Sequence, residues 1–276
     1  MIVHLVDGTY ELFRHFYGIR RFKKTDPPFG AVSGVLTTVA QLLDEGGTHV
    51  GVATDHIIES FRNTLWRGYK TGAGIEPALR AQFVPLEEAL LAMGVTVWPM
   101  VELEADDALA SAAYLAARDE RVEKVCIWTP DKDLAQCIVD DRVVQVDRKS
   151  GVIRNAEGVR AKFGVAPRFI PDYLALVGDS ADGYPGISGC GPKTAAQLIN
   201  RFGPLEEFPA NVLNDENRPL ALLFKELAIL KTDAPLFEDV DELRWRGATP
   251  KFEAMTEKIE NPRLLTKVRK LERNLR

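Results

Sequence analysis

The sequence contains only three cysteines, Cys126, Cys137 and Cys190, and none of them belongs to a CxxC pair. An odd number with this spacing excludes a disulfide framework and a cysteine-bound zinc site, so we expect a protein of the reducing cytoplasm. No apolar run approaches the roughly 20 residues that a membrane-spanning helix needs. Residues 1–7 lack the basic region and cleavage site of a secretory signal, so we interpret them as a first strand and expect no membrane partner.

Positive charge is not in excess, since the formal net charge is −5 over 276 residues. Hydrophobic residues make up 46% and charged residues 27%, which is typical of a soluble globular chain with one large domain or two modest ones. Basic residues nevertheless gather in three stretches, at 20–24, 62–70 and 267–276. Each stretch alone is more typical of a solvated surface than of a binding site. Their positions relative to the acidic motifs of the chain favour a role in binding.

Strand-like apolar runs recur at residues 2–6, 48–53, 95–98, 124–128 and 142–146, with helical stretches at 9–17, 31–43, 77–93 and 105–117. This alternation predicts an α/β fold with a mainly parallel central sheet flanked by helices. Beyond about residue 154 the pattern becomes helical, at 155–163, 167–177, 193–202, 219–231 and 262–275. We therefore predict an α/β domain over residues 1–154 and a helical region over residues 155–276.

Two linkers stand out between these elements. Residues 20–30 carry four basic residues and a Pro-Pro pair. Residues 56–77 are long for a strand-to-helix connection, which usually has about 2–6 residues, and they contain Trp66-Arg67-Gly68-Tyr69-Lys70. Because this second linker leaves directly from an aspartate, Asp55, we favour a functional loop.

Acidic residues form short motifs that mostly follow the predicted strands. The nine carboxylates are Asp7, Asp55, Glu104, Asp106, Asp107, Asp131, Asp133, Asp179 and Asp182. Ligands of an open α/β sheet collect at the carboxyl ends of its strands, and a crowded cluster of carboxylates repels itself unless a cation neutralises it. The motifs therefore predict a metal-dependent enzyme, and the oxygen-only ligands favour Mg²⁺ or Mn²⁺ over zinc. A simpler interpretation of Asp106 and Asp107 is that they stabilise the start of helix 105–117.

A glycine-dense turn spans residues 183–191 and runs into Pro192-Lys193-Thr194 at the start of a predicted helix. Glycine permits positive φ, and the exposed N–H groups of such a turn bind phosphate without reading a base. A lone glycine turn is more often a tight connection between helices. Its place just after Gly178-Asp179 and Asp182 makes the phosphate-binding interpretation more specific.

With these motifs in place, the chain resembles the 5′ nuclease family, which includes the 5′-3′ exonuclease domain of bacterial DNA polymerase I, phage 5′ nucleases and the flap endonucleases. The resemblance extends over nearly the whole chain, as far as Phe202-Gly203. The matching motifs, in chain order, are Asp7-Gly8 with Phe13-Arg14, Asp55 with Phe61-Arg62, Tyr69-Lys70, Leu79-Arg80-Ala81-Gln82, Glu104-Ala105-Asp106-Asp107, Asp131-Lys132-Asp133-Leu134-x-Gln136, and Gly178-Asp179-x-x-Asp182 through Lys193-Thr194-Ala195. Seven motifs in the same order make coincidence implausible.

The resemblance implies a nuclease domain with a helix–three-turn–helix element over about residues 178–203 that grips duplex DNA. It also implies an arch or loop over the active site, at about residues 56–85. Polymerase domains like those of the bacterial homologue do not follow, so we expect a stand-alone, monomeric nuclease. The implied partner is DNA, as a flap, a nicked duplex or a 5′-ended duplex.

The resemblance also assigns roles to residues. The first ion would be held by Asp7, Asp55, Glu104 and Asp106, and the second by Asp131, Asp133 and Asp179, with Asp106 as a candidate bridge. Asp107 and Asp182 would act in the outer shell, Lys70 would contact the scissile phosphate, Tyr69 would stack on a base, and Arg80 is a further catalytic candidate. The implied DNA contacts are Arg14, Arg62, Gly186, Gly189, Gly191, Lys193 and Thr194. A K⁺ ion at the glycine turn is a further implied cofactor.

The expected function is therefore that of a structure-specific 5′ nuclease of DNA replication and repair, a 5′-3′ exonuclease or flap endonuclease with two divalent ions. The family commonly has Tyr-Lys-x-x-Arg where this chain has Ala73, so the alternative is a weakened or inactive homologue that binds DNA junctions. A phosphatase of the haloacid dehalogenase type fails, because Leu5 stands where its nucleophilic aspartate would be. A PIN-type ribonuclease would not explain the glycine turn or the basic loop.

Overall fold

The computed structural model describes residues 1–22 and 27–275, within which six strands form one sheet in the order β3-β2-β1-β4-β5-β6. The strands are β1 (Ile2–Asp7), β2 (His49–Asp55), β3 (Thr96–Met100), β4 (Lys124–Trp128), β5 (Val143–Asp147) and β6 (Val152–Arg154). Strands β1 to β5 are parallel, and β6 pairs antiparallel with β5. The five predicted strands and the mainly parallel sheet are confirmed.

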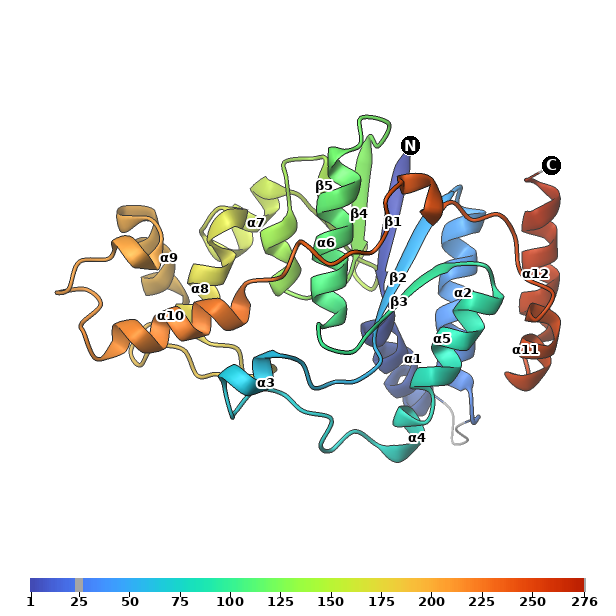
Figure 1. Cartoon of the computed structure of the whole chain (residues 1–276), viewed down its shortest axis with the longest axis horizontal. Helices are drawn as coiled ribbons and strands as arrows, with labels where there is room; N and C mark the ends of the chain where they lie inside the picture. Colours follow the sequence, from blue (N-terminus) through green and yellow to red (C-terminus); the bar gives the residue numbers. More distant parts are fainter. Residues whose placement is uncertain (23–26, 276) are drawn as a thin grey trace.

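Helices cover both faces of the sheet (Figure 1). On one face α1 (Gly8–Phe22), α2 (Gly30–Asp44) and α5 (Phe83–Ala92) share a hydrophobic core with Val6, Val50 and Val52. On the other face α6 (Ala105–Arg118) packs against Val3 and Leu5. Successive side chains of a strand point to opposite faces, so strands buried on both faces must be apolar almost throughout. The runs in β1 and β2 meet this requirement and place these strands at the centre of the molecule.

The single helix predicted over residues 77–93 is wrong, because the chain forms two helices, α4 (Pro77–Arg80) and α5. The break lies at Gln82, which has φ −98° and ψ −5°. Its side-chain oxygen accepts hydrogen bonds from the backbone N–H groups of Ala31 (3.2 Å) and Val32 (3.3 Å). Gln82 therefore satisfies two otherwise unpaired donors in the first turn of α2.

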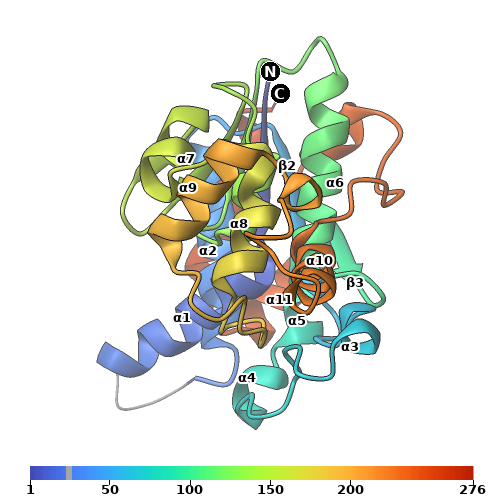
Figure 2. The same ribbon diagram turned by 90° about the vertical axis from the view of Figure 1, so that its left-hand side faces the viewer.

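The second part of the chain builds a separate hydrophobic core from α7 (Ala156–Phe163), α8 (Ile170–Val177), α9 (Pro192–Phe202) and α10 (Asn217–Ala228). Short 3₁₀ helices at Pro167–Phe169 and Leu205–Glu207 connect these elements, and a further one at Asp133–Cys137 lies between β4 and β5. Figure 2 shows α7, α8 and α9 close together at the end of the molecule that faces the viewer. The predicted helical character of this part is confirmed, and the glycine turn joins α8 to α9.

The chain then returns to the first core. Residues 229–251, with a 3₁₀ helix at Val240–Leu243, run along the molecule to α11 (Phe252–Lys258) and α12 (Pro262–Arg273). The indole of Trp245 donates a hydrogen bond to the carbonyl of Met93 (2.8 Å), and Phe252 and Val268 are buried in the core of α2 and α5. Figure 1 shows α11 and α12 at the opposite end from α9 and α10. The last part of the helical region thus packs on the α/β part.

The loop expected over the site is irregular, apart from α3 (Arg62–Leu65) and α4. Of the basic stretches, Lys23, Lys24 and Arg276 lie outside the described residues. Among the helices that the structure describes, none is long and apolar enough to cross a membrane.

Candidate active site

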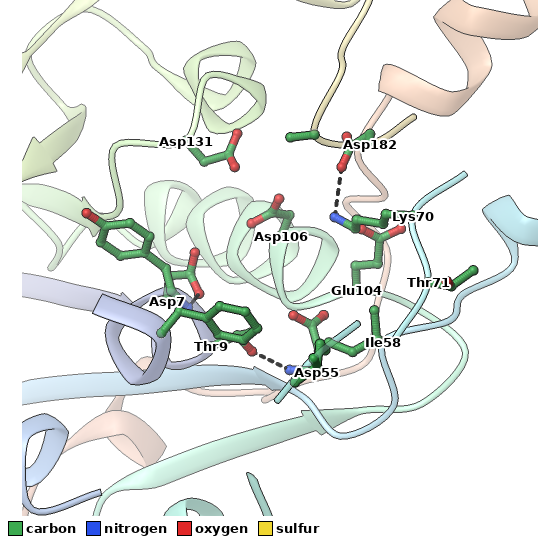
Figure 3. Close-up of a pocket in the computed structure, with 14 residues that line it drawn as sticks. Asp7, Thr9, Asp55, Ile58, Lys70, Thr71, Glu104, Asp106, Asp131 and Asp182 are labelled. Carbon is green, nitrogen blue, oxygen red and sulfur yellow. Dashed lines mark hydrogen bonds and ion pairs between the residues drawn. The ribbon is translucent and has the colours of Figure 1, made fainter. Parts of the chain in front are cut away.

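The carboxyl ends of three neighbouring strands open into a cleft of about 370 Å³. Asp7 ends β1, Asp55 ends β2 and Asp131 follows β4, while Glu104 and Asp106 stand at the start of α6. Parallel strands bring these positions together from distant parts of the chain. Figure 3 shows the carboxylates around the cleft, and those among the lining residues are Asp7, Asp55, Glu104, Asp106, Asp131 and Asp182.

A second group of carboxylates adjoins the first. Ligand oxygens of Asp133, Asp179 and Asp182 all lie within 4.8 Å of one another. Asp133 begins the 3₁₀ helix after β4, whereas Asp179 and Asp182 belong to the turn after α8. Because Asp182 also lines the cleft, the two groups form one acidic centre. The structure thus brings together eight of the nine carboxylates that the sequence singled out.

Hydrogen bonds orient the carboxylates at the ends of β1 and β2. The side chain of Asp7 accepts from the backbone N–H of Tyr10 (2.8 Å) and from the hydroxyl of Thr129 (3.0 Å). Asp55 accepts from the backbone N–H of Ala105 (2.8 Å), at the first residue of α6. The N–H groups at the starts of α1 and α6 therefore stabilise negative charge in the cleft.

Burial makes this centre electrostatically unfavourable without a cation. It raises the pKa of Asp7 to about 7, and it also raises the pKa of Asp55. Burial and then the charge of Asp131 raise the pKa values of Asp106 and Asp133 well above the ordinary range. Carboxylates in this state hold protons unless a positive ion replaces them.

Asp133 provides the strongest sign that the centre fits a metal. Among the described residues, its Oδ1 atom is buried and has no hydrogen-bond partner. A buried polar atom without a partner costs free energy, which a bound cation would offset. The donor set consists of carboxylate oxygens, which suit a hard cation such as Mg²⁺ or Mn²⁺.

Two lysines contact the acidic centre. The Nζ atom of Lys70 lies 2.7 Å from Glu104 Oε2 and 3.0 Å from Asp182 Oδ1. Burial opposes its charge, but these two carboxylates hold the pKa of Lys70 well above its ordinary value. Lys132 lies 2.7 Å from Asp179 Oδ2, a contact that our sequence reasoning missed, although the residue stands between two predicted ligands. Lys70 therefore lies in the cleft, where its predicted contact with the scissile phosphate requires it.

Arg62 lies inside the protein, and its environment contradicts the expected DNA contact. Its side chain is only 1% exposed and makes two hydrogen bonds of 2.7 Å to Asp107 and one of 3.0 Å to Glu104. The remaining donors bind the carbonyls of Leu227 and Ile229. All five N–H groups of the guanidinium are thus used within the protein.

The structure explains Asp107 as the partner of Arg62 and as a helix cap. Its carboxylate accepts from the backbone N–H of Glu104 (3.0 Å), and the two residues form a capping box at the start of α6. It also accepts from the backbone N–H of Lys231 (2.9 Å). Fully buried in these contacts, Asp107 stands apart from the metal-facing carboxylates, and the simpler interpretation given by the sequence accounts for it.

Burial contradicts the role expected of Tyr69, whereas the roles of Arg80 and Arg14 stay predictions. Tyr69 is 4% exposed and its hydroxyl lies 3.3 Å from Glu104 Oε2, so its ring belongs to the core and is not open to a base. Arg80 is exposed at the end of α4, outside the set of described residues that line the cleft. Arg14 is partly exposed and pairs with Glu11, with Nε 3.0 Å from Oε1.

The glycine turn divides into a buried and an open part. Gly186 has φ +71°, and a Cβ there would lie 2.4 Å from the backbone N of Gly178, so this glycine serves close packing and not a contact with DNA. Gly189 and Gly191 have open space around them, and Lys193 and Thr194 are exposed in the first turn of α9. The open part is therefore accessible to a phosphate, as its predicted role demands.

Comparison with known proteins gives two family matches that follow each other along the chain. Residues 2–164 match the family described as 5′-3′ exonuclease, N-terminal resolvase-like domain, and residues 165–251 match 5′-3′ exonuclease, C-terminal SAM fold. A 5′-3′ exonuclease of Buchnera aphidicola subsp. Schizaphis graminum is 30% identical over 253 residues, which cover 84% of this chain and 87% of that protein. DNA polymerase I of Pseudomonas aeruginosa is 34% identical over 259 residues, which cover 87% of this chain but 28% of the polymerase.

A solved structure of the flap endonuclease of bacteriophage T5, in a complex with DNA and metal ions, has a similar fold. Its TM-score is 0.65 at 18% sequence identity, with coverage of 95% of this chain and 100% of that one. This likeness agrees with the predicted sheet and helical C-terminal part. The first family match alone extends over more than half of the chain. The chain belongs to the 5′-3′ exonuclease family.

Proposed function

We propose that this protein hydrolyses DNA phosphodiester bonds at a 5′ end or at the base of a 5′ flap, with two divalent cations held by the acidic centre. One observation carries the proposal: eight carboxylates from five separate segments converge, and a buried oxygen of Asp133 lacks a partner among the described residues. Such a cluster of buried carboxylates raises the free energy of the folded protein, and bound cations would offset this cost. Membership of the 5′-3′ exonuclease family supports the same chemistry.

The geometry suggests how the ligands divide between the two ions. Asp7 and Asp55 line the cleft at the ends of β1 and β2, and Glu104 and Asp106 line it at the start of α6, so these four would hold the first ion. Asp133, Asp179 and Asp182 form the compact second group, and we add Asp131, which lines the cleft beside it. This division differs from the sequence-based expectation by bringing Asp182 among the direct ligands and removing Asp107.

Two such ions, when bound, supply activation of water, stabilisation of the charge that develops on the phosphate, and neutralisation of the leaving oxygen. The protein's own contribution is to position the phosphate between them. Lys70 is the residue best placed for this task, because its ammonium group lies in the cleft beside Glu104 and Asp182. This ammonium group would contact the scissile phosphate as a point charge.

The glycine turn would hold the duplex at a phosphate other than the one that is cut. Gly189, Gly191, Lys193 and Thr194 are exposed at the start of α9, where backbone N–H groups and an ammonium group can meet one phosphate. We retain Mg²⁺ or Mn²⁺ as the divalent ions, a K⁺ ion at this turn, a monomeric state and a cytoplasmic location as parts of the proposal. The T5 relative bound to DNA and metal ions supports the choice of ligand class.

The test is a cleavage assay with 5′-labelled flap, nicked-duplex and single-stranded oligonucleotides in Mg²⁺. We expect short 5′ fragments from the flap or from the nicked duplex, with the cut near the junction of single and double strand. Failure to cut any of the three substrates, with binding to the flap preserved, would favour the alternative of an inactive junction-binding homologue.

A further inference from the structure

Gln145 connects the loop of the acidic centre to an arginine outside it. This glutamine is fully buried in β5, and its amide nitrogen donates to the backbone carbonyl of Asp131. Its amide oxygen accepts from the guanidinium of Arg154, the register partner of Gln145 on β6. The position of Arg154 is therefore fixed relative to the loop that carries Asp131 and Asp133.

The side chain of Arg154 lies over α7 because a glycine leaves room for it. A Cβ atom at Gly158 would lie 3.0 Å from Arg154 Cγ. Lys162 stands four residues after Gly158, on the same face of α7, and is exposed. Burial and then the charge of Arg154 lower the pKa of Lys162, as expected for two cations held close together.

No described carboxylate forms a close ion pair with Arg154 or Lys162, although the charges of Asp131 and Asp147 act on Lys162 from a longer distance. Within residues 1–22 and 27–275, no carboxylate oxygen lies within 4.0 Å of either side-chain charge. The nearby Asp147 accepts from the hydroxyl of Ser150 (2.7 Å) and the backbone N–H of Lys149 (2.9 Å) in its own hairpin turn. Lys132 also lies near them but is paired with Asp179. Asp131 and Asp147 offset the repulsion between the two cations only in part, since neither makes an ion pair with them, and an anion bound between the cations would remove it.

We propose that Arg154 and Lys162 bind a backbone phosphate of the DNA, next to the acidic centre on its Asp131 side. The site rests on the proposed function, because it is a contact of the same substrate. A guanidinium can bind two phosphate oxygens at once and an ammonium group adds a point charge. Gln145 acts as the positioning residue, since its two hydrogen bonds set the distance between this phosphate and the ligand loop.

The first test measures binding of a 5′-flap duplex in Ca²⁺ at several salt concentrations, with gel analysis to verify that the DNA stays intact. Arg154→Ala and Lys162→Ala should each weaken binding and flatten the slope of log affinity against log salt by about 0.9, the loss of one phosphate contact. Arg160→Ala is the matched control, because Arg160 is an exposed arginine on the same helix. Arg154→Lys should keep most of the slope, since the charge remains.

The second test replaces single phosphates of the flap duplex by neutral methylphosphonates. The wild-type protein should bind the flap duplex more weakly when the methylphosphonate stands at one particular position near the cleavage junction. The Arg154→Ala variant should bind the duplex with or without the methylphosphonate at that position equally well. Equal affinities and slopes for wild type, Arg154→Ala and Lys162→Ala would overturn the inference. That result, with cleavage by wild type intact, refutes only this site, whereas absent binding and cleavage by wild type would refute the proposed function.

Discussion

Arg62 joins three segments of the protein through one side chain. It belongs to α3, pairs with Glu104 and Asp107 at the start of α6, and donates to the carbonyls of Leu227 and Ile229 at the end of α10. Although burial opposes its charge, Lys70 and then Arg62 hold the pKa of Glu104 below its ordinary value. Arg62 therefore helps Lys70 to keep Glu104 ionised, and it does so from inside the protein.

Removing the Arg62 side chain should destabilise the protein strongly. Arg62→Ala leaves the buried carboxylate of Asp107 without its counter-ion, a change that costs about 3–5 kcal/mol in other proteins. Urea unfolding should therefore show a large fall in the free energy of unfolding. Arg80→Ala, at an exposed arginine, should stay within about 0.5 kcal/mol of wild type. A small change for Arg62→Ala would mean that the buried pairing is not important for stability.

Replacement of Lys70 should lower the turnover number of the enzyme. Its ammonium group lies among the carboxylates of the cleft, where it would contact the phosphate that is cut. Lys70→Ala should lower kcat by roughly 100-fold, the size seen when one stabilising donor is lost, with a smaller change in KM. Lys251→Ala, at an exposed lysine before α11, is the control. An unchanged kcat for Lys70→Ala would exclude Lys70 from the chemistry.

The sequence predicts the carboxylates well because each follows a strand or begins a helix, and strand ends of a parallel sheet share one edge. The sequence does not predict that the side chains of Arg62 and Tyr69 point into the protein. Both lie in a loop rich in basic and aromatic residues, which suggests a surface that meets DNA. Their burial depends on partners 35 to 167 positions away, such as Glu104 and Ile229, whose proximity is a result of folding.

Among the structural elements, the turn between α8 and α9 combines two tasks. Its first part carries Asp179 and Asp182, and Gly186 packs against the end of α8. Its last part exposes Gly189, Gly191 and the start of α9. One short segment therefore carries two carboxylates of the second acidic group and also the proposed phosphate grip.

Lys193 tests whether that grip is separate from the chemistry. Lys193→Ala should raise KM on duplex substrates and reduce the salt slope of binding by about 0.9, because one phosphate contact is lost. The kcat at saturating DNA should stay close to wild type, since Lys193 lies on α9 and outside the described lining of the cleft. A loss of kcat with unchanged KM would show that the turn does not act as an independent grip.

The limits of sequence-based prediction are clearest for the short elements. Helix α11 has seven residues, of which only Phe252 and Thr256 are buried, so its apolar pattern is too brief to predict a helix. The break between α4 and α5 at Gln82 could not be predicted for another reason, since it depends on N–H groups of α2 some 50 positions earlier. A strand such as β2 was predictable because it is buried on both faces, which leaves little choice of residue.

At the scale of the whole molecule, the active site depends on the docking of the two cores. The backbone N–H of Lys70 donates to the carbonyl of Asp182 (2.9 Å), and the indole of Trp66 donates to the carbonyl of Gly183 (3.0 Å). These bonds tie the loop after β2 to the turn after α8. The C-terminal helices strengthen the α/β core from the far end. The acidic centre is complete only when both parts are folded together.

If this acidic centre hydrolyses DNA, cleavage must depend on divalent cations, and removal of the cations by a chelator measures that dependence. A 5′-labelled flap oligonucleotide should be incubated with the protein in excess EDTA and again after Mg²⁺ or Mn²⁺ is added back in excess. We predict that cleavage disappears in EDTA and returns with either ion, because the clustered carboxylates cannot accept a phosphate while they are unneutralised. Undiminished cleavage in EDTA would mean that the acidic centre does not act through divalent cations.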